Sequence, residues 1–191
     1  MSFHRRRLPH WVPDQAIVFV TWRLAGSPAP KFPAGERFES GPLWLRDPRI
    51  ANMLANSLVY GEAVRRFYCL HAWVIMPNHV HAVIEPRTSM PAVMRWLKGR
   101  TGRVANRMLE RVGAPFWQDE SFDHWVRTPE ELRYLIGYVE DNPVNAGLVA
   151  SRELWPWSSG ADHRFLWSAD ATEERQTTKN DRLPHRDGGV E

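Results

Sequence analysis

The sequence lacks the features that would place the protein in a membrane or outside the cell. Its 191 residues contain no apolar run near the ~18 residues that a membrane-spanning helix needs. The opening residues, MSFHRRRLPHW, carry charge without the apolar stretch of a signal peptide. The single cysteine, Cys69, cannot form an internal disulfide. From these absences we expect a cytoplasmic protein.

A large excess of charge of one sign is missing as well. The 25 lysines and arginines face 22 acidic residues, so the net charge of +3 says little about nucleic acid. The cations are nonetheless concentrated between residues 95 and 111, where Glu110 is the one acidic residue. Arginine suits phosphate recognition because its guanidinium group is a planar fork of donors. A solvated helix face and a phosphate-binding face both fit this cluster, which comprises Arg95, Lys98, Arg100, Arg103, Arg107 and Arg111.

What the sequence does contain is enough apolar material for one folded domain. Hydrophobic residues make up 43% of the chain, and there are ten tryptophans. From about residue 161 the sequence is polar, charged and without periodicity. We therefore predict a domain over residues 1–160 and a disordered tail over residues 161–191.

The first half of the chain predicts three strands and one helix. Residues 15–26 are rich in β-branched and aromatic residues and end at a glycine, which is typical of a strand. Asp47 before Pro48 is typical of a helix start, and apolar residues then recur on one helical face. Residues 65–76 and 79–86 predict two strands joined by a Pro-Asn turn, which indicates a hairpin.

The second half predicts a helix, short strand pieces and another helix. Apolar residues recur at helical spacing from residue 89 to about residue 111, before a glycine and a proline. Residues 116–126 indicate short strand pieces around an acidic turn. Thr128 is typical of an N-cap with Glu131 at the capping-box position, and Pro143 predicts the helix end near residue 142. The element order suits an α+β fold, with an antiparallel sheet and helices on one face.

Two histidines follow the hairpin turn in the segment VIMPNHVHAVIE. Residues two apart in a strand point to the same side, so His79 and His81 face together while Val80 and Ala82 face a core. Two imidazoles on one face can bind a divalent metal, but they need a further ligand. On spacing alone, two histidines on the solvated side of a strand are the more common case.

Tyr138 and Asn142 lie together on the last predicted helix, beside its apolar stripe. They are four residues apart, so their side chains stack on the same side. An activated phenol can attack phosphorus, and an amide oxygen can bind a hard metal ion. Taken alone, a half-buried tyrosine at a sheet edge and an asparagine C-cap are the more ordinary interpretations.

Four motifs occur in order and together resemble a known family. They are MPNHVHAVIE, RWLKGRTGRVANRMLERVGAPFWQDESFDHWVR, YVEDNPVNAGLV and WPWSS. In this combination the sequence resembles the single-tyrosine HUH transposases, and most closely the branch of REP-associated tyrosine transposases. The resemblance runs from about Ile17 to Ser159.

This resemblance implies a fold, a site and a substrate. The fold is a ferredoxin-like antiparallel sheet with flanking helices. His79, His81 and Asn142 bind Mg²⁺ or Mn²⁺, and Tyr138 is the nucleophile. The substrate is single-stranded DNA near a hairpin, which is cut through a 5′-phosphotyrosine intermediate with release of a 3′-OH and is then transferred to another strand. We further expect DNA-phosphate contacts from the arginine-rich segment, and a nucleoid-associated monomer or homodimer. For Arg5–Arg7, contact with a hairpin and a solvated basic terminus both fit.

Three alternatives stay open at this point. A catalytically inactive hairpin-binding protein or repressor of the same fold is disfavoured by the intact residue set. A metal hydrolase in which water attacks would need carboxylates beside the histidines, yet Glu85 lies roughly 13 Å along the strand from His81. Tyr134, one turn before Tyr138, is a competing nucleophile, although its spacing to Asn142-Pro143 does not match the family.

Overall fold

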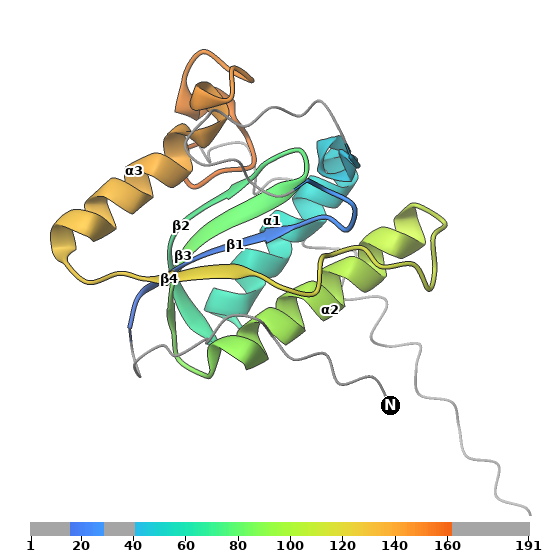
Figure 1. Ribbon diagram of the computed structural model, residues 1–191, viewed down its shortest axis with the longest axis horizontal. Helices are drawn as coiled ribbons and strands as arrows, with labels where there is room; N and C mark the ends of the chain where they lie inside the picture. The colour runs from blue at the N-terminus through green and yellow to red at the C-terminus, as the bar shows by residue number, and fades with distance from the viewer. Residues whose placement is uncertain (1–15, 29–40, 162–191) are drawn as a thin grey trace, which may run out of the picture. The chain divides into compact units, whose positions relative to one another are not determined.

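The computed structural model describes residues 16–28 and 41–161 (Figure 1). The four strands and three α-helices of these residues follow the order that the sequence predicts, and two short 3-10 helices, η1 and η2, were not predicted. Predictions for Arg5–Arg7 and for the tail beyond residue 161 lie outside the described residues. No helix in the described ranges is long and apolar enough to cross a membrane. The elements are β1 (Val18–Arg23), η1 (Trp44–Arg46), α1 (Pro48–Ala63), β2 (Tyr68–Ile75), β3 (His79–Pro86), α2 (Met90–Met108), β4 (Phe122–Trp125), α3 (Pro129–Asn145) and η2 (Arg152–Leu154).

The four strands form one antiparallel sheet in the order β2-β3-β1-β4. Each neighbouring pair is antiparallel, so β1 and β2 run parallel to one another with β3 between them. This arrangement is the split β-α-β topology of ferredoxin-like folds. The predicted α+β class, the hairpin of β2 and β3 and the flanking helices are confirmed.

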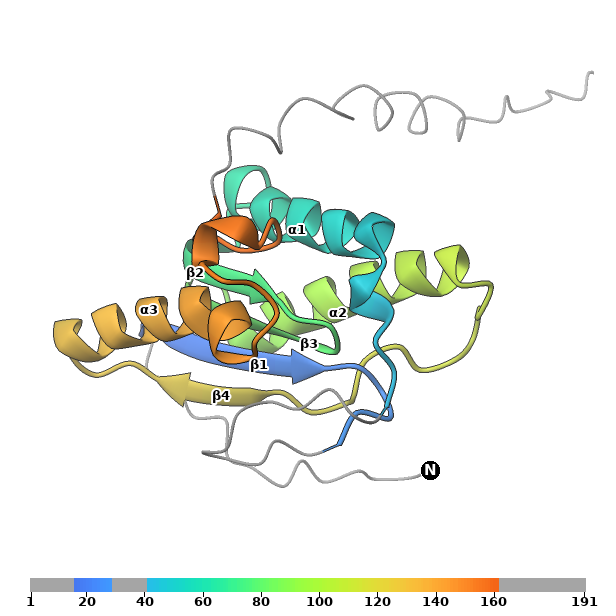
Figure 2. The same cartoon turned by 90° about the horizontal axis from the view of Figure 1, so that it is seen from above.

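Helices cover both faces of this sheet (Figure 2). One cluster of buried apolar residues joins α1 and α2 to the face that carries Trp22, Val80 and Ala82. A second, smaller cluster joins α3 to the opposite face, where Phe19 and Val83 lie. The prediction that the helices share one face is therefore wrong for α3. Helical periodicity shows which side of a helix is apolar, but not which side of a sheet it covers.

A β-bulge in β2 sets which residues of that strand point to each face. Leu70 pairs with Ile84 and Ala72 pairs with Val83, so His71 is the extra residue in β2. Beyond the bulge, Trp73 and Ile75 join the α1–α2 cluster, whereas Val74 and Met76 join the α3 cluster. Both clusters thus depend on the register that the bulge fixes.

The predicted N-caps at Asp47 and Thr128 are confirmed, but Glu131 does not close the predicted capping box. The Asp47 carboxylate accepts a hydrogen bond from the Arg49 N–H at the start of α1, and the hydrogen bond to the Arg49 side chain lowers the pKa of Asp47. The Thr128 hydroxyl accepts from the Glu131 N–H at the start of α3. The Glu131 carboxylate in turn accepts from the Arg127 N–H, one residue before the cap, rather than from the cap itself.

Two predicted helix boundaries need correction. Helix α3 continues through Pro143 to Asn145, because a proline in the last turn removes only its own N–H and already has a helical φ. Helix α2 ends at Met108 rather than near Arg111. The buried side of α2 includes Thr101 and Ala105. The Thr101 hydroxyl accepts a hydrogen bond from the indole N–H of Trp117 at 3.0 Å.

Candidate metal and tyrosine site

The two histidines of β3 converge at their Nε2 atoms, which lie 3.0 Å apart. Both rings are on the α3 side of the sheet and are buried, with exposed fractions of 0% for His79 and 2% for His81. The interpretation of a solvated pair is therefore wrong. Two ligands at right angles, each about 2.1 Å from a metal, are separated by about 3.0 Å. The spacing fits adjacent positions of an octahedral ion.

The other nitrogen of each ring contacts a neighbouring polar side chain. His79 Nδ1 is 2.7 Å from Asn78 Oδ1, and His81 Nδ1 is 2.6 Å from Thr21 Oγ1. With each Nδ1–H donating to its oxygen, the rings keep a lone pair on Nε2, as metal ligands require. The hydrogen bonds also fix the orientation of both rings. Sequence reasoning missed both partners; Asn78 adjoins the pair in the turn, whereas Thr21 lies on another strand.

Tyr138 faces this histidine pair from α3. Its ring centroid is 5.7 Å from that of His81 and 6.0 Å from that of Phe19, in edge-to-face geometry. Phe19 also stacks on His81, with centroids 5.4 Å apart and planes 22° apart. Tyr134, the competing nucleophile, is 71% exposed. The geometry brings Tyr138 and the histidines together, and it gives Tyr134 no such contact.

Asn142 is buried on α3 one turn after Tyr138, with an exposed fraction of 4%. Its side-chain oxygen has no hydrogen-bond donor among the described residues. A buried amide oxygen without a partner costs free energy, so the arrangement calls for a donor or a cation. An amide oxygen and imidazole nitrogens are donor types that divalent metal ions accept.

The arginine-rich segment lies on the face of the sheet opposite the histidine pair. It belongs to α2, whose buried side packs with α1 against the face that carries Trp22, Val80 and Ala82. Arg95, Arg103 and Arg107 are exposed on this helix. Arg100 lies over the Tyr60 ring at 5.5 Å, and Arg111 lies over the Trp44 ring at 3.8 Å. The predicted cationic face is therefore divided between outward arginines and arginines that cover aromatic rings.

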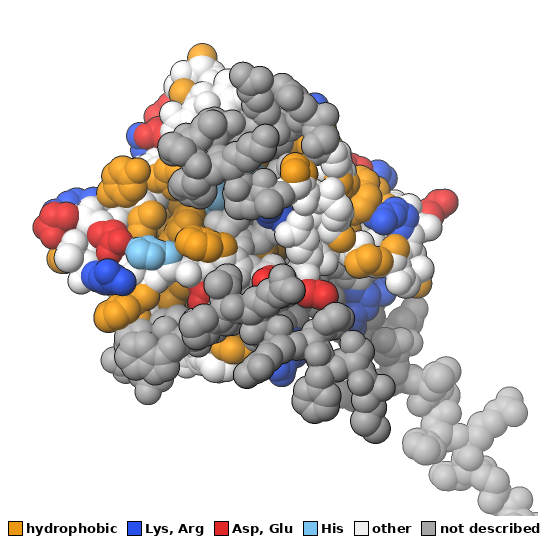
Figure 3. All heavy atoms as spheres, in the orientation of Figure 1, with side chains coloured by type: hydrophobic (Ala, Val, Ile, Leu, Met, Phe, Trp, Pro, Cys, Tyr) orange, Lys and Arg blue, Asp and Glu red, His pale blue; other side chains and the backbone are white. Residues whose placement is uncertain are grey.

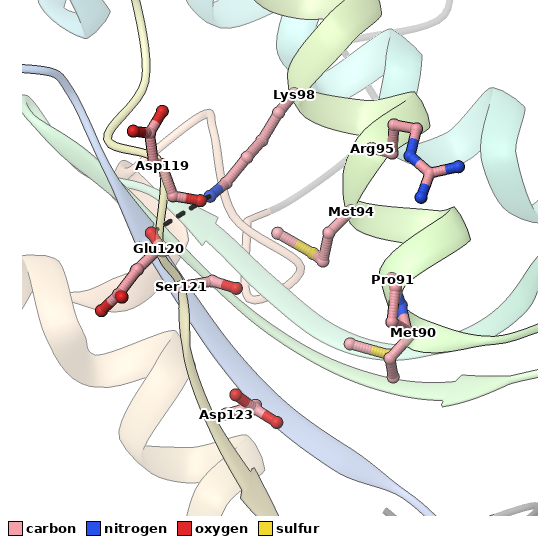
Figure 4. Close-up of a pocket in the computed structure, with 9 residues that line it drawn as sticks. All are labelled: Met90, Pro91, Met94, Arg95, Lys98, Asp119, Glu120, Ser121 and Asp123. Atoms are coloured by element: carbon pink, nitrogen blue, oxygen red, sulfur yellow. Dashed lines mark hydrogen bonds between the residues drawn. The ribbon is translucent and has the colours of Figure 1, made fainter. Parts of the chain in front are cut away.

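Lys98 closes a hollow between α2 and the loop that leads into β4 (Figure 4). Its ammonium group donates to three backbone carbonyls, those of Gln118, Asp119 and Glu120, at 3.0–3.1 Å. Arg95 and three acidic residues, Asp119, Glu120 and Asp123, line the same hollow. The Asp119 and Glu120 carboxylates point away from α2 (Figure 4). The structure thus gives Lys98 a role in anchoring this loop.

We expect Lys98→Met to lower the free energy of unfolding, as the main effect of this substitution. The substitution keeps the length of the side chain but removes a charged donor from three carbonyls, at a cost of about 1–3 kcal/mol. Urea unfolding followed by circular dichroism measures this loss. Arg103→Met, at an exposed position of the same helix, is the matched control and should change the unfolding free energy by less than about 0.5 kcal/mol. Equal stability of the two variants would contradict the anchoring role.

Comparison with known proteins identifies the family. Residues 57–142, which include His79, His81, Tyr138 and Asn142, match the family described as "Transposase IS200 like". This segment, which is less than half of the chain, is similar to the IS200-like transposases. The predicted resemblance to transposases is thereby confirmed, and the family supports a role in DNA binding and DNA transposition.

A solved structure of a tyrosine transposase shows the same fold. A REP-associated tyrosine transposase bound to a REP hairpin superimposes with a TM-score of 0.56 at 21% identity. The match covers 83% of this chain and 82% of that one. A putative transposase from Deinococcus radiodurans matches 72% of this chain and 98% of its own length, at 14% identity and a TM-score of 0.42. No curated protein matches. The likeness in fold therefore rests on the first match.

Proposed function

We propose that this IS200-like transposase chain cleaves and rejoins single-stranded DNA through a covalent bond to Tyr138. The observation that carries the proposal is the contact between the Tyr138 ring and a pair of buried histidines whose Nε2 atoms converge. A nucleophile and a candidate cation site thus lie side by side. Because Tyr138 and His81 of one chain are in contact, the arrangement supports catalysis by the chain's own tyrosine.

The metal would be held by His79, His81 and Asn142. Hydrogen bonds to Asn78 and Thr21 orient the two histidine rings, and the Asn142 side-chain oxygen has no hydrogen-bond partner among the described residues. When bound, a divalent ion neutralises charge on the phosphate oxygens and orients the phosphodiester. Two imidazole nitrogens suit Mn²⁺ better than Mg²⁺, which prefers an all-oxygen shell. We therefore propose Mg²⁺ or Mn²⁺ as the cofactor and expect higher activity with Mn²⁺.

Tyr138 supplies the nucleophile. Its phenol oxygen loses a proton and forms a bond to phosphorus, while the bond from phosphorus to the 3′-oxygen breaks. The strand 3′ of the cut remains on the tyrosine through its 5′-phosphate, and the strand 5′ of the cut leaves with a 3′-hydroxyl after its 3′-oxygen takes up a proton. Attack by another 3′-OH reverses these bond changes and returns the phenol. No nucleotide cofactor is needed, because the covalent bond conserves the energy of the phosphodiester.

We infer that the DNA partner carries a hairpin, as does the DNA in the structurally similar REP-associated transposase. The outward arginines of α2 and the histidine site lie on opposite faces of the sheet, so DNA that contacts both must pass a sheet edge. The β2 edge is covered at Trp73–Ile75 by hydrogen bonds to residues 157–159. The edge at β4 is therefore the proposed route.

Side chains near β4 fit this route. Phe122 is 52% exposed and contacts Phe19 of the site edge-to-face, with centroids 6.4 Å apart. Trp125 is 37% exposed, and the Arg127 guanidinium lies 5.7 Å from its ring. Exposed hydrophobic side chains gather over α3 and β4 in the space-filling view (Figure 3). Aromatic and cationic groups together are typical of surfaces on which unpaired bases stack.

The direct test is to incubate the full chain with hairpin-bearing single-stranded DNA and Mn²⁺. We expect a covalent protein–DNA adduct that survives denaturing electrophoresis and carries label placed 3′ of the cut but none placed 5′ of it. Chelation by EDTA should abolish the adduct but leave hairpin binding measurable by gel shift. Binding without any adduct at all would overturn the proposed cleavage and would favour a hairpin-binding protein.

A further inference from the structure

A second set of metal-ligating side chains lies where β2 and β3 pair, away from the histidine pair. Cys69 is opposite Glu85 in the register, and His71 is the extra residue of the β2 bulge. The ligand atoms of these three residues all lie within 4.8 Å of one another. Among the described residues, this is the one cluster of three histidine, cysteine or acidic side chains so arranged.

The His71 ring is placed as a ligand rather than as a hydrogen-bonded side chain. Its Nε2 atom is buried and has no hydrogen-bond partner among the described residues. The nearest carboxylate oxygen, of Glu85, is 3.6 Å away, which is too long for a hydrogen bond. A nitrogen and an oxygen ligand at tetrahedral positions of Zn²⁺ are separated by about 3.3–3.5 Å, given bonds of about 2.0–2.2 Å. The 3.6 Å spacing of this pair is about 0.1 Å longer, so a small movement of either side chain would fit the ion.

We propose that Cys69, His71 and Glu85 bind a transition-metal dication of the Zn²⁺ class. One thiolate, one imidazole and one carboxylate are donors that this class prefers, whereas Mg²⁺ prefers oxygen alone. Glu85 is roughly 13 Å along β3 from His81, so this cluster cannot share an ion with the histidine pair. The ion would join the edge strand β2 to β3 at its bulge.

Cys69 must lose its proton for this binding. Burial, together with the Glu62 and Glu85 carboxylates, raises the pKa of the Cys69 thiol. The incoming dication therefore displaces one proton to solvent as the sulfur–metal bond forms. Glu62 accepts a hydrogen bond from the Leu70 N–H at 2.7 Å, which holds its carboxylate beside the cluster. A fourth position remains for water or Glu62. The His71 and Glu85 side chains, 25% and 44% exposed, leave the ion a path from solvent.

Cobalt is the probe that separates this cluster from the histidine pair, because only the cluster contains sulfur. Full-length protein stripped with chelator is titrated with Co²⁺, and the sulfur-to-cobalt charge-transfer band is followed in the near ultraviolet. We expect a band that saturates at one equivalent and disappears on addition of Zn²⁺. Cys69→Ser should abolish it, and His71→Gln should weaken Zn²⁺ binding by at least about 10-fold.

The control is His81→Gln, which removes a ligand of the other site and should leave the cobalt band unchanged. Circular dichroism verifies that each variant is folded. Two results would overturn the proposal: no sulfur-to-cobalt band in the natural sequence, or a band of full strength in the His71→Gln Glu85→Gln double variant. The second result would mean that the thiol alone binds the ion. Neither result depends on DNA cleavage, so the proposed function stands or fails separately.

Discussion

Replacing Tyr138 with phenylalanine is expected to reduce the rate at which the covalent adduct with DNA forms by at least about 10³-fold. The substitution removes only the phenol oxygen, which is the atom that would bond to phosphorus. The ring can keep its contacts with Phe19 and His81, so the fold and the metal ligands stay in place. Single-turnover cleavage of labelled hairpin DNA measures the loss, and gel shift should show DNA binding within about twofold of the original.

Tyr134→Phe is the matched control for this prediction. Tyr134 is on the same helix, one turn earlier, and is 71% exposed. Its replacement should leave the rate of adduct formation within about twofold. If Tyr138→Phe still formed the adduct and Tyr134→Phe did not, the nucleophile would be assigned to the wrong residue. Equal adducts from both variants would contradict a tyrosine nucleophile on this helix.

Local sequence patterns predicted most of the secondary structure because the information they use is itself local. Asp47, Thr128 and Glu131 act at helix starts through groups within four residues. Strand alternation placed His79 and His81 on one face, which requires only their spacing. The family resemblance added the selection of Tyr138 over Tyr134, because each was an ordinary helix residue when considered alone.

The remaining features depend on contacts between distant segments. Thr21 is sixty residues before His81, so no local pattern connects its hydroxyl to the imidazole. Burial of the histidines depends on α3 covering the face opposite α1 and α2, which periodicity does not determine. Lys98 appeared to belong to a phosphate-binding face until the loop near residue 120 placed three carbonyls around it. Each of these features depends on how distant segments pack together, and not on what each element is.

The second large effect is expected at His81. His81→Gln should reduce Mn²⁺-dependent cleavage by about 10²–10⁴-fold, because it removes one of the two converging nitrogens. Glutamine fills much of the volume of the buried ring, which limits the loss of packing against Phe19. Cleavage at a range of Mn²⁺ concentrations, with thermal unfolding of the same samples, separates a lost ligand from a lost fold.

Thr21→Val tests whether orientation of the His81 ring contributes to metal binding. The variant keeps the ligands and the shape of the site but removes the oxygen 2.6 Å from His81 Nδ1. Loss of such a partner weakens metal affinity by about 10–100-fold. Cleavage should therefore fall at low Mn²⁺ and recover at high Mn²⁺, whereas His81→Gln should not recover. If Thr21→Val required no more Mn²⁺ than the natural sequence, the hydrogen bond would have no part in metal binding. If His81→Gln recovered fully, the second nitrogen would not be a necessary ligand.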